Sequence, residues 1–153
     1  MSSARERFGA ARVARLATVG EAAEGTGADT SGSGATGTAP HLVPIVFALA
    51  PDADVVYSCV DHKPKRTRRL RRLANITANP AVSLLVDHYA DDWTALWWVR
   101  VDGLADVVDA DTATGVAAID LLSEKYPQYR TRRPDGPVIV VRDLVWHEWA
   151  ARP

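Results

Sequence analysis

The sequence has one cysteine, no long apolar run and almost no net charge, and each of these absences excludes a class of protein. With Cys59 as the only cysteine, the chain cannot form an internal disulfide, which is typical of proteins from reducing compartments. No window approaches the roughly 18 apolar residues of a membrane-spanning helix, and the arginine-rich beginning lacks the apolar core of a secretory signal. We therefore expect a cytoplasmic protein that does not bind a membrane.

The charges and the polar residues also argue against several kinds of site. Eighteen Lys and Arg residues against 19 Asp and Glu residues give a formal net charge of −1, so the whole chain has no general attraction for nucleic acid. The four histidines are scattered, and no pair has the spacing of metal ligands. Ser58 and Cys59 have no base nearby in the sequence. We therefore expect no metal site and no catalytic side chain.

The pattern of apolar residues predicts a single, mainly β domain over residues 1–153, with flanking helices. Six strands are expected, at 15–20, 40–49, 55–60, 81–89, 95–108 and 138–149. Helices are expected at 4–15, in the first part of 65–80, and from Asp111 to about Tyr126. Because most strands follow each other without a helical crossover, we expect an antiparallel sheet closed into a small barrel with the helices outside.

Three local features modify this pattern. Residues 21–39 contain Gly, Ala, Ser, Thr and acidic residues but no large apolar side chain, so we expect a flexible loop within the domain, with an ordered lid as the alternative. Pro44 predicts a sheet edge or a bulge, because proline has no N–H to donate to a neighbouring strand. Gly103 predicts a bulge in the long strand 95–108.

The strongest candidate for a binding site is a basic segment, residues 63–72, with the sequence KPKRTRRLRR. We expect it to open a helix, where clustered cations oppose the helix dipole and free backbone N–H groups point outward. A bound anion would offset both effects, and Thr67 would add a hydroxyl donor. From the residues alone, three interpretations remain open: a solvated surface, a nucleic-acid patch, and a site for the phosphate or carboxylate of a small ligand.

A second candidate feature is the group of tryptophans in ADDWTALWWVR, namely Trp93, Trp97 and Trp98. Trp97 and Trp98 are adjacent in an expected strand, so their side chains should point to opposite faces of the sheet. Tryptophan suits interfaces and flat ligands because it presents a large area with few rotamers. The alternative is that these rings are simply buried in the core.

Four stretches together resemble a known family: RLATVG, PHLVPIVFAL, KPKRTRRLRRLANITANPAVSLLVDHYADDW and LWWVRVDGLADVV. The third is the most specific, because a Lys/Arg-Thr-Arg-x-Leu helix start followed by Asn-Pro and a strand is a pattern of that family. The chain resembles the pyridoxamine-phosphate-oxidase-like split β-barrel superfamily over nearly its whole length. It is most similar to the flavin/deazaflavin oxidoreductases described as coenzyme F420-dependent. The resemblance implies a six-stranded antiparallel split β-barrel of the FMN-binding type.

The resemblance also implies a homodimer with two cofactor sites at the subunit interface. The implied phosphate contacts are Ser58, Lys65, Arg66, Thr67 and Arg68. Pro44, Ile45 and Val46 would lie along the cofactor ring, and Trp93 from the partner subunit would cover it. The remaining arginines of the segment, Arg69, Arg71 and Arg72, are assigned to the cofactor tail or to plain surface. Surplus arginines favour coenzyme F420, with its longer anionic tail, over the alternative FMN.

The activity that follows from the resemblance is hydride transfer between reduced deazaflavin and a small conjugated electrophile. The cofactor would carry the chemistry, and the protein would supply position and a dry site. Two alternatives stay open: an FMN-binding oxidoreductase of the pyridoxamine-phosphate-oxidase type, and a non-catalytic protein that binds flavin or deazaflavin.

Overall fold

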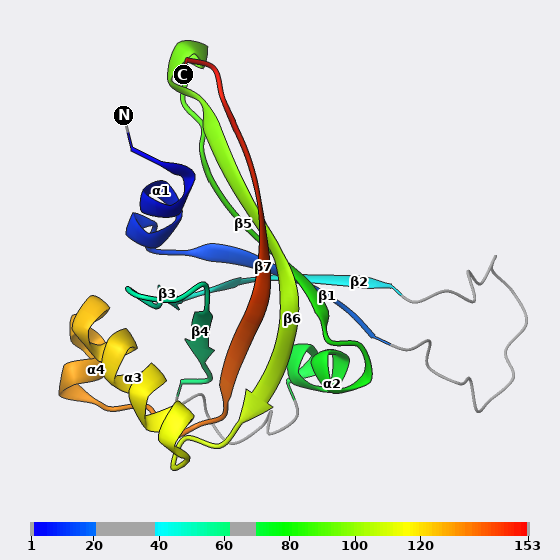
Figure 1. Ribbon diagram of the computed structural model, residues 1–153, viewed down its shortest axis with the longest axis vertical. Coiled ribbons are helices and arrows are strands. Elements are labelled where there is room, and N and C mark those ends of the chain that lie inside the picture. Colours follow the sequence, from blue (N-terminus) through cyan, green and yellow to red (C-terminus); the bar gives the residue numbers. More distant parts are fainter. Residues whose placement is uncertain (1, 21–38, 62–69, 153) are drawn as a thin grey trace, which may run out of the picture.

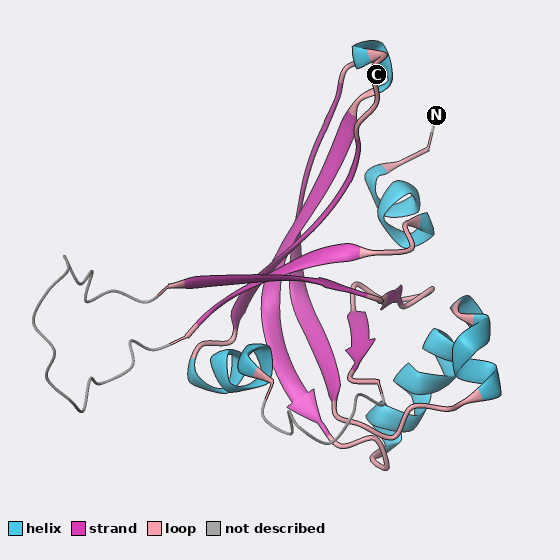
Figure 2. Ribbon diagram, turned by 180° about the vertical axis from the view of Figure 1, so that it is seen from behind, coloured by secondary structure: helices cyan, strands magenta, loops and turns pink. Residues whose placement is uncertain are grey.

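A computed structural model of the chain describes residues 2–20, 39–61 and 70–152. It confirms a mainly β architecture with flanking helices (Figures 1 and 2). Seven strands form one antiparallel sheet in the order β2-β1-β5-β6-β7-β4-β3. Their bounds are β1 Ala14–Val19, β2 Pro40–Ile45, β3 Ala48–Leu49, β4 Val56–Cys59, β5 Ala81–His88, β6 Trp97–Val108 and β7 Val138–Ala150. The loop expected at 21–39 falls almost entirely outside the described residues.

The sheet has seven strands where six were expected, because the segment 40–49 forms two of them. β2 and β3 lie at opposite ends of the strand order, yet only Val46 and Phe47 separate them along the chain. The sheet must therefore curl until its two edges approach each other at this link. Pro44 lies in β2, an edge strand, as its missing N–H predicts.

The hydrophobic core fills the inside of this curled sheet. Phe8 and Phe47 are fully buried, with ring centroids 4.8 Å apart, and the Trp146 ring meets Phe8 edge-on at 5.4 Å. Leu16 and Leu84 come from paired positions of β1 and β5 and point into the same core. The link between the two sheet edges is thus anchored by the aromatic centre of the core.

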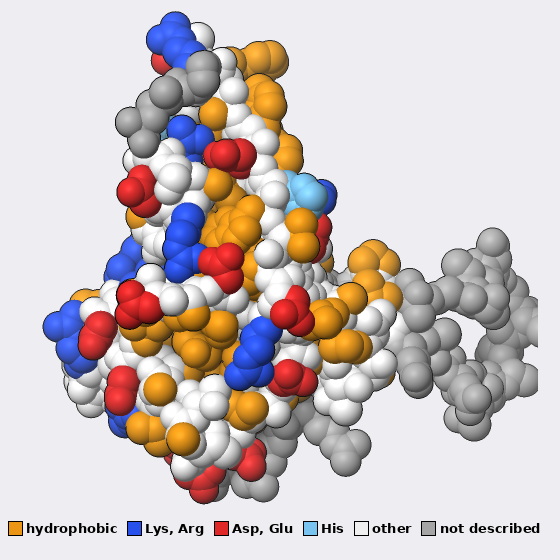
Figure 3. All heavy atoms as spheres, in the orientation of Figure 1, with side chains coloured by type: hydrophobic (Ala, Val, Ile, Leu, Met, Phe, Trp, Pro, Cys, Tyr) orange, Lys and Arg blue, Asp and Glu red, His pale blue; other side chains and the backbone are white. Residues whose placement is uncertain are grey.

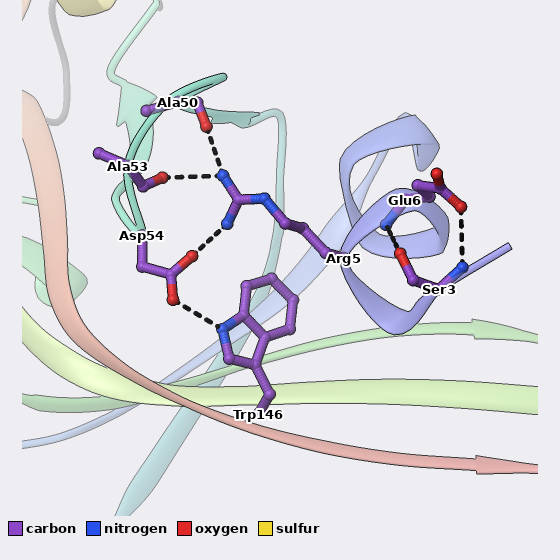
Figure 4. A network of polar contacts seen from close by, with 7 residues as sticks. All are labelled: Ser3, Arg5, Glu6, Ala50, Ala53, Asp54 and Trp146. Atoms are coloured by element: carbon purple, nitrogen blue, oxygen red, sulfur yellow. Dashed lines mark hydrogen bonds and ion pairs between the residues drawn. The ribbon is translucent and has the colours of Figure 1, made fainter.

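The first helix, α1 (Ala4–Ala10), is tied to the turn between β3 and β4 by one arginine (Figure 4). The Arg5 guanidinium donates to the carbonyl oxygens of Ala50 at 2.8 Å and Ala53 at 2.9 Å, and it pairs with Asp54. The other carboxylate oxygen of Asp54 accepts from Trp146 Nε1 at 3.4 Å. α1 is shorter than the helix expected at 4–15, because the backbone is already extended at Ala11.

The long strand β6 behaves as its sequence predicts. Its pairing with β7 shifts register between Asp102 and Leu104, so Gly103 marks a bulge. A Cβ on Gly103 would lie 2.7 Å from the Arg142 carbonyl oxygen, so glycine allows the close approach. Trp97 packs against the core while Trp98 lies on the outer face, which confirms that the two rings point to opposite sides.

The remaining helices begin later than expected. Helix α2 (Arg71–Ala78) follows its N-cap residue Leu70, whose backbone is extended. α3 (Ala113–Lys125) is capped by Thr112, whose hydroxyl accepts from the Gly115 N–H, and not by Asp111. A short α4 (Pro127–Thr131) follows where a loop was expected. Among the described residues no helix is both long and apolar enough to cross a membrane.

The hydroxyl of Tyr126 joins three parts of the fold, and its removal should be costly. Tyr126 Oη accepts from the Phe47 N–H at 3.1 Å and lies 2.8 Å from the Arg12 carbonyl oxygen. Tyr126→Phe leaves the buried Phe47 N–H without a partner, so we expect the free energy of unfolding to fall by about 1–3 kcal/mol. Urea denaturation measures this loss. Tyr89→Phe, at an exposed tyrosine, should change stability by less than about 0.5 kcal/mol; equal losses would contradict this role.

Candidate functional site

A cavity of about 170 Å³ lies beside the link where the two edges of the sheet approach each other. Its walls come from the chain before β1, the end of β2 and the β2–β3 link, β4 and the residues just after it, and the start of α2. The lining residues are Val13, Pro44, Ile45, Val46, Ser58, Cys59, Asp61 and Arg72. The structure therefore brings together four of the residues proposed for the cofactor from sequence: Pro44, Ile45, Val46 and Ser58.

Ser58 holds the wall of this cavity in place. Its hydroxyl donates to the Val46 carbonyl oxygen at 2.7 Å, and the side chain is buried. A serine hydroxyl has one proton, so this bond uses its donor and leaves only its acceptor capacity toward the cavity. Ser58 thus joins β4 to the β2–β3 link, a role that the sequence alone did not suggest.

The structure places the charged side chain of Arg72 in the cavity wall. From the sequence, this residue was expected to contact the cofactor tail or to lie on the surface. It is half-buried, and within the described chain its buried Nε has no hydrogen-bond partner. Burial lowers the pKa of Arg72, while the negative charge of Asp61 opposes this shift. An unpaired buried donor beside a cavity can be satisfied by a ligand acceptor.

Helical spacing is the signal that could have identified Arg72. Asn75 and Ile76 are buried, and Arg72 precedes them by three and four residues, so the three share the inward face of α2. Arg71 lies one position earlier and is exposed. The sequence showed an arginine cluster at this point, and the burial of Asn75 and Ile76 separates the inward Arg72 from the outward Arg71.

Cys59 forms an inert part of the cavity wall. Its side chain is 4% exposed, and burial raises the pKa of the thiol to about 11, against a contribution from Tyr129 that lowers it. Because the thiolate is the reactive species, alkylation at pH 8 should be at least about 100-fold slower in the native protein than in the unfolded chain. The rate of iodoacetamide labelling, with and without guanidinium, measures this ratio. Comparable rates would contradict a buried thiol.

The basic residues proposed for the phosphate, Lys65, Arg66, Thr67 and Arg68, lie outside the described residues. Their flanks are described, however. Asp61 lines the cavity before this segment, and Leu70 follows it, two residues before Arg72. The chain therefore enters and leaves the basic segment close to the cavity.

Trp93 does not lie at the cavity of its own chain. It belongs to a short 3-10 helix, η1 (Trp93–Ala95), in the β5–β6 connection, and its side chain is 77% exposed. Figure 1 shows this connection at the opposite end of the long strands from α2. A cofactor in the cavity could be covered by Trp93 only from a second copy of the chain.

The outer face of the sheet carries apolar side chains that no helix buries. Leu42, Val145 and Trp149 are 65%, 56% and 45% exposed. Polar groups lie between them: Asp102 accepts from the Ser83 hydroxyl at 2.5 Å and pairs with His147 Nε2 at 3.1 Å. Figure 3 shows hydrophobic side chains mixed with charged ones over the face of the molecule seen in that view. A mixed, partly apolar surface of this kind is typical of a protein–protein interface.

Comparisons with known proteins agree with this architecture. The family model described as "Pyridoxamine 5'-phosphate oxidase" matches residues 2–150. The heme storage protein HutZ from Vibrio cholerae is 18% identical, with a TM-score of 0.59 over 93% of this chain and 87% of its own. An FAD-binding protein from Mesorhizobium loti is 19% identical, with a TM-score of 0.59 over 98% and 96%.

General Stress Protein 26 from Bacillus anthracis is 18% identical, with a TM-score of 0.51 over 90% of this chain and 83% of its own. No curated protein matches the sequence. At these identities the solved structures establish a shared fold, and the family model covers almost the whole chain. The chain therefore belongs to the pyridoxamine 5'-phosphate oxidase family.

Proposed function

We propose that this protein is an F420-dependent oxidoreductase that transfers a hydride between reduced deazaflavin and a small conjugated electrophile. The observation that carries the proposal is the cavity beside the β2–β3 link. There the expected ring-facing residues Pro44, Ile45 and Val46 meet Arg72, whose buried Nε has no hydrogen-bond partner among the residues that the structure describes. The family match and the FAD-binding protein of the same fold support a flavin-type cofactor.

The described residues fit such a cofactor by their chemistry. When bound, a deazaflavin supplies the hydride, so no side chain of the protein needs to act as acid or base. Val13, Ile45 and Val46 provide an apolar wall that excludes water from one face of the ring. Ser58 fixes Val46 in that wall, and Arg72 offers a donor to the bound group. Lys65, Arg66, Thr67 and Arg68 are proposed to bind the phosphate.

The proposed assembly is a homodimer in which each cofactor site uses both subunits. The exposed apolar side chains on the outer face of the sheet support an interface there. Trp93 supports a shared site, because it is exposed and belongs to the β5–β6 connection, which lies at the opposite end of the long strands from α2 (Figure 1). The proposed location is the cytoplasm, with no nucleic-acid partner.

The choice of F420 over FMN rests on the number of cations near the site. One phosphate needs few of the arginines in residues 63–72, whereas the lactyl-oligoglutamate tail of F420 brings additional carboxylates. The family match favours FMN as the second candidate cofactor. The shared fold of the heme storage protein HutZ favours non-catalytic binding as the second candidate role.

Thermal melting with each cofactor tests this proposal. A ligand that binds only the folded protein raises its stability by RT ln(1 + [L]/Kd), so the tighter cofactor gives the larger shift at equal concentration. We expect F420 to raise the melting temperature more than FMN does. Equal shifts, or none with either cofactor, would contradict the preference for F420. Hydride transfer to a panel of quinones and enones then separates an enzyme from a storage protein.

A further inference from the structure

Strands β1 and β2 stop pairing at the edge of the cavity. Their antiparallel register ends with Ala14 opposite Ile45. A ladder longer by two residues would place Arg12 opposite Phe47, where the two backbones could exchange N–H···O bonds. The pairing stops because the chain after β2 turns away from β1, and β3 pairs with β4 instead. The segment before β1 and the β2–β3 link therefore separate at this point.

The hydroxyl of Tyr126 lies between the two separated backbones. It accepts from the Phe47 N–H at 3.1 Å, and its own proton can be donated to the carbonyl oxygen of Arg12 at 2.8 Å or to that of Phe47 at 2.9 Å. Tyr126 is the C-cap residue of α3, so a third element supplies this hydroxyl. A side chain thus bridges two backbone groups that could otherwise bond directly to each other.

The neighbouring residue, Lys125, binds the segment before β1 to the end of α3. Its ammonium group donates to the carbonyl oxygens of Gly9 at 2.9 Å and Ala11 at 2.7 Å. Arg12 Nη1 donates to the Lys125 carbonyl oxygen at 2.9 Å. The backbone of this segment is therefore held by the last turn of α3 and not by the β2–β3 link.

The two separated segments continue directly into the walls of the cavity. Val13 follows Arg12, Val46 precedes Phe47, and both valines line the cavity. Direct pairing of Arg12 with Phe47 would bring the backbones to the spacing of neighbouring strands, about 4.5–5.5 Å between opposite Cα atoms. The space between the two valines would then close.

We infer that Tyr126 is a positioning residue whose hydroxyl holds the walls of the cavity apart, so that the site is open before a cofactor enters. The inference rests on the proposed function for the identity of the occupant. A site that is formed in advance binds more tightly, because no binding energy is used to separate its walls. If pairing closed the site in about 90% of the molecules, the apparent dissociation constant would rise about tenfold.

Tyr126→Phe tests the inference, because it removes the hydroxyl and keeps the ring. We expect the dissociation constants of FMN and F420 both to rise about tenfold or more, as measured by fluorescence titration. A crystal structure of the variant without cofactor should show Phe47 N within about 3.2 Å of the Arg12 carbonyl oxygen. This second measurement does not depend on any cofactor.

Val86→Ala is the matched control for a loss of stability alone. Val86 is 1% exposed in β5 and does not line the cavity. Urea denaturation should show that both variants are destabilised, since each loses a buried contact. We expect the affinity of Val86→Ala for both cofactors to stay within about threefold of the wild-type value.

Lys125→Met gives a second test if Tyr126→Phe does not fold. It leaves the carbonyl oxygens of Gly9 and Ala11 without their donor and so releases the segment before β1. Both dissociation constants should then rise by at least about threefold. Unchanged affinity of Lys125→Met would in that case overturn the inference.

Two results with Tyr126→Phe would overturn the inference. One is a crystal structure in which Phe47 N and the Arg12 carbonyl oxygen stay as far apart as in the wild type. The other is an affinity no weaker than that of Val86→Ala. In both cases the wild type still binds a cofactor, so the proposed function stands. A wild type that binds neither FMN nor F420 would overturn the proposed function, and the crystal structure of Tyr126→Phe would still decide whether the hydroxyl separates the walls.

Discussion

Replacing Lys65, Arg66 and Arg68 together by glutamine should weaken F420 binding by about 100-fold or more, because each charge-assisted hydrogen bond to an anion contributes about 1.5–3 kcal/mol. The three residues belong to the basic segment 63–72, in a chain whose formal net charge is −1. Fluorescence titration of F420 against wild type and variant measures the change.

The matched control removes the same amount of charge elsewhere. Arg132, Arg142 and Arg152 are exposed and do not line the cavity, so their joint replacement by glutamine should change F420 affinity by less than about threefold. If both triple variants lost affinity equally, the effect would come from overall charge. If the first variant lost less than about threefold, the assignment of the phosphate to Lys65, Arg66 and Arg68 would be wrong.

Phe47→Ala should produce the largest loss of stability, about 3–5 kcal/mol, because removing a fully buried aromatic ring leaves a cavity that the core fills only in part. Phe47 is 0% exposed and packs on Phe8. Lys125 Nζ lies 4.0 Å from the centroid of its ring. The substitution therefore loosens the point where the curled sheet brings its two edges together. Urea denaturation of wild type and variant measures the loss.

The same substitution should also affect the binding site. Val46 precedes Phe47 and forms part of the cavity wall, so a loosened link moves the expected ring-facing residues. Val116→Ala, at an exposed position of α3, is the control, and it should change the free energy of unfolding by less than about 0.5 kcal/mol. A loss below about 1 kcal/mol for Phe47→Ala would show that this link does not anchor the core.

Local features of the fold could be predicted because each depends on the chemistry of one residue. Pro44 lies in an edge strand since it cannot donate to a neighbour on one side. Gly103 marks a bulge since a side chain there would collide with β7. Trp97 and Trp98 face opposite sides because successive residues of a strand alternate.

The features that were not predicted depend on tertiary geometry. The division of the segment 40–49 into β2 and β3 follows from the curl of the sheet, because each half pairs with a different partner. The alternation of apolar residues along this segment is the same whether the segment forms one strand or two. The expected strand count was therefore one too low, although the mainly β class with flanking helices was correct.

Tertiary geometry also explains why the candidate site could be predicted only in part. Pro44, Ile45, Val46 and Ser58 do meet at one cavity. Arg72 was assigned to the tail or the surface because its inward direction depends on where α2 begins. Trp93 remains a prediction that requires a second subunit, since it does not line the cavity of its own chain and belongs to the β5–β6 connection.

A crystal structure of the protein with bound F420 would test directly whether the cavity beside the β2–β3 link holds the cofactor. We expect the deazaflavin ring to lie against Pro44, Ile45 and Val46, and Arg72 Nε to lie within about 3.2 Å of an acceptor atom of the cofactor. We also expect the phosphate to contact Lys65, Arg66, Thr67 and Arg68. A cofactor bound away from the β2–β3 link, with Arg72 Nε still without a partner, would show that this cavity is not the cofactor site.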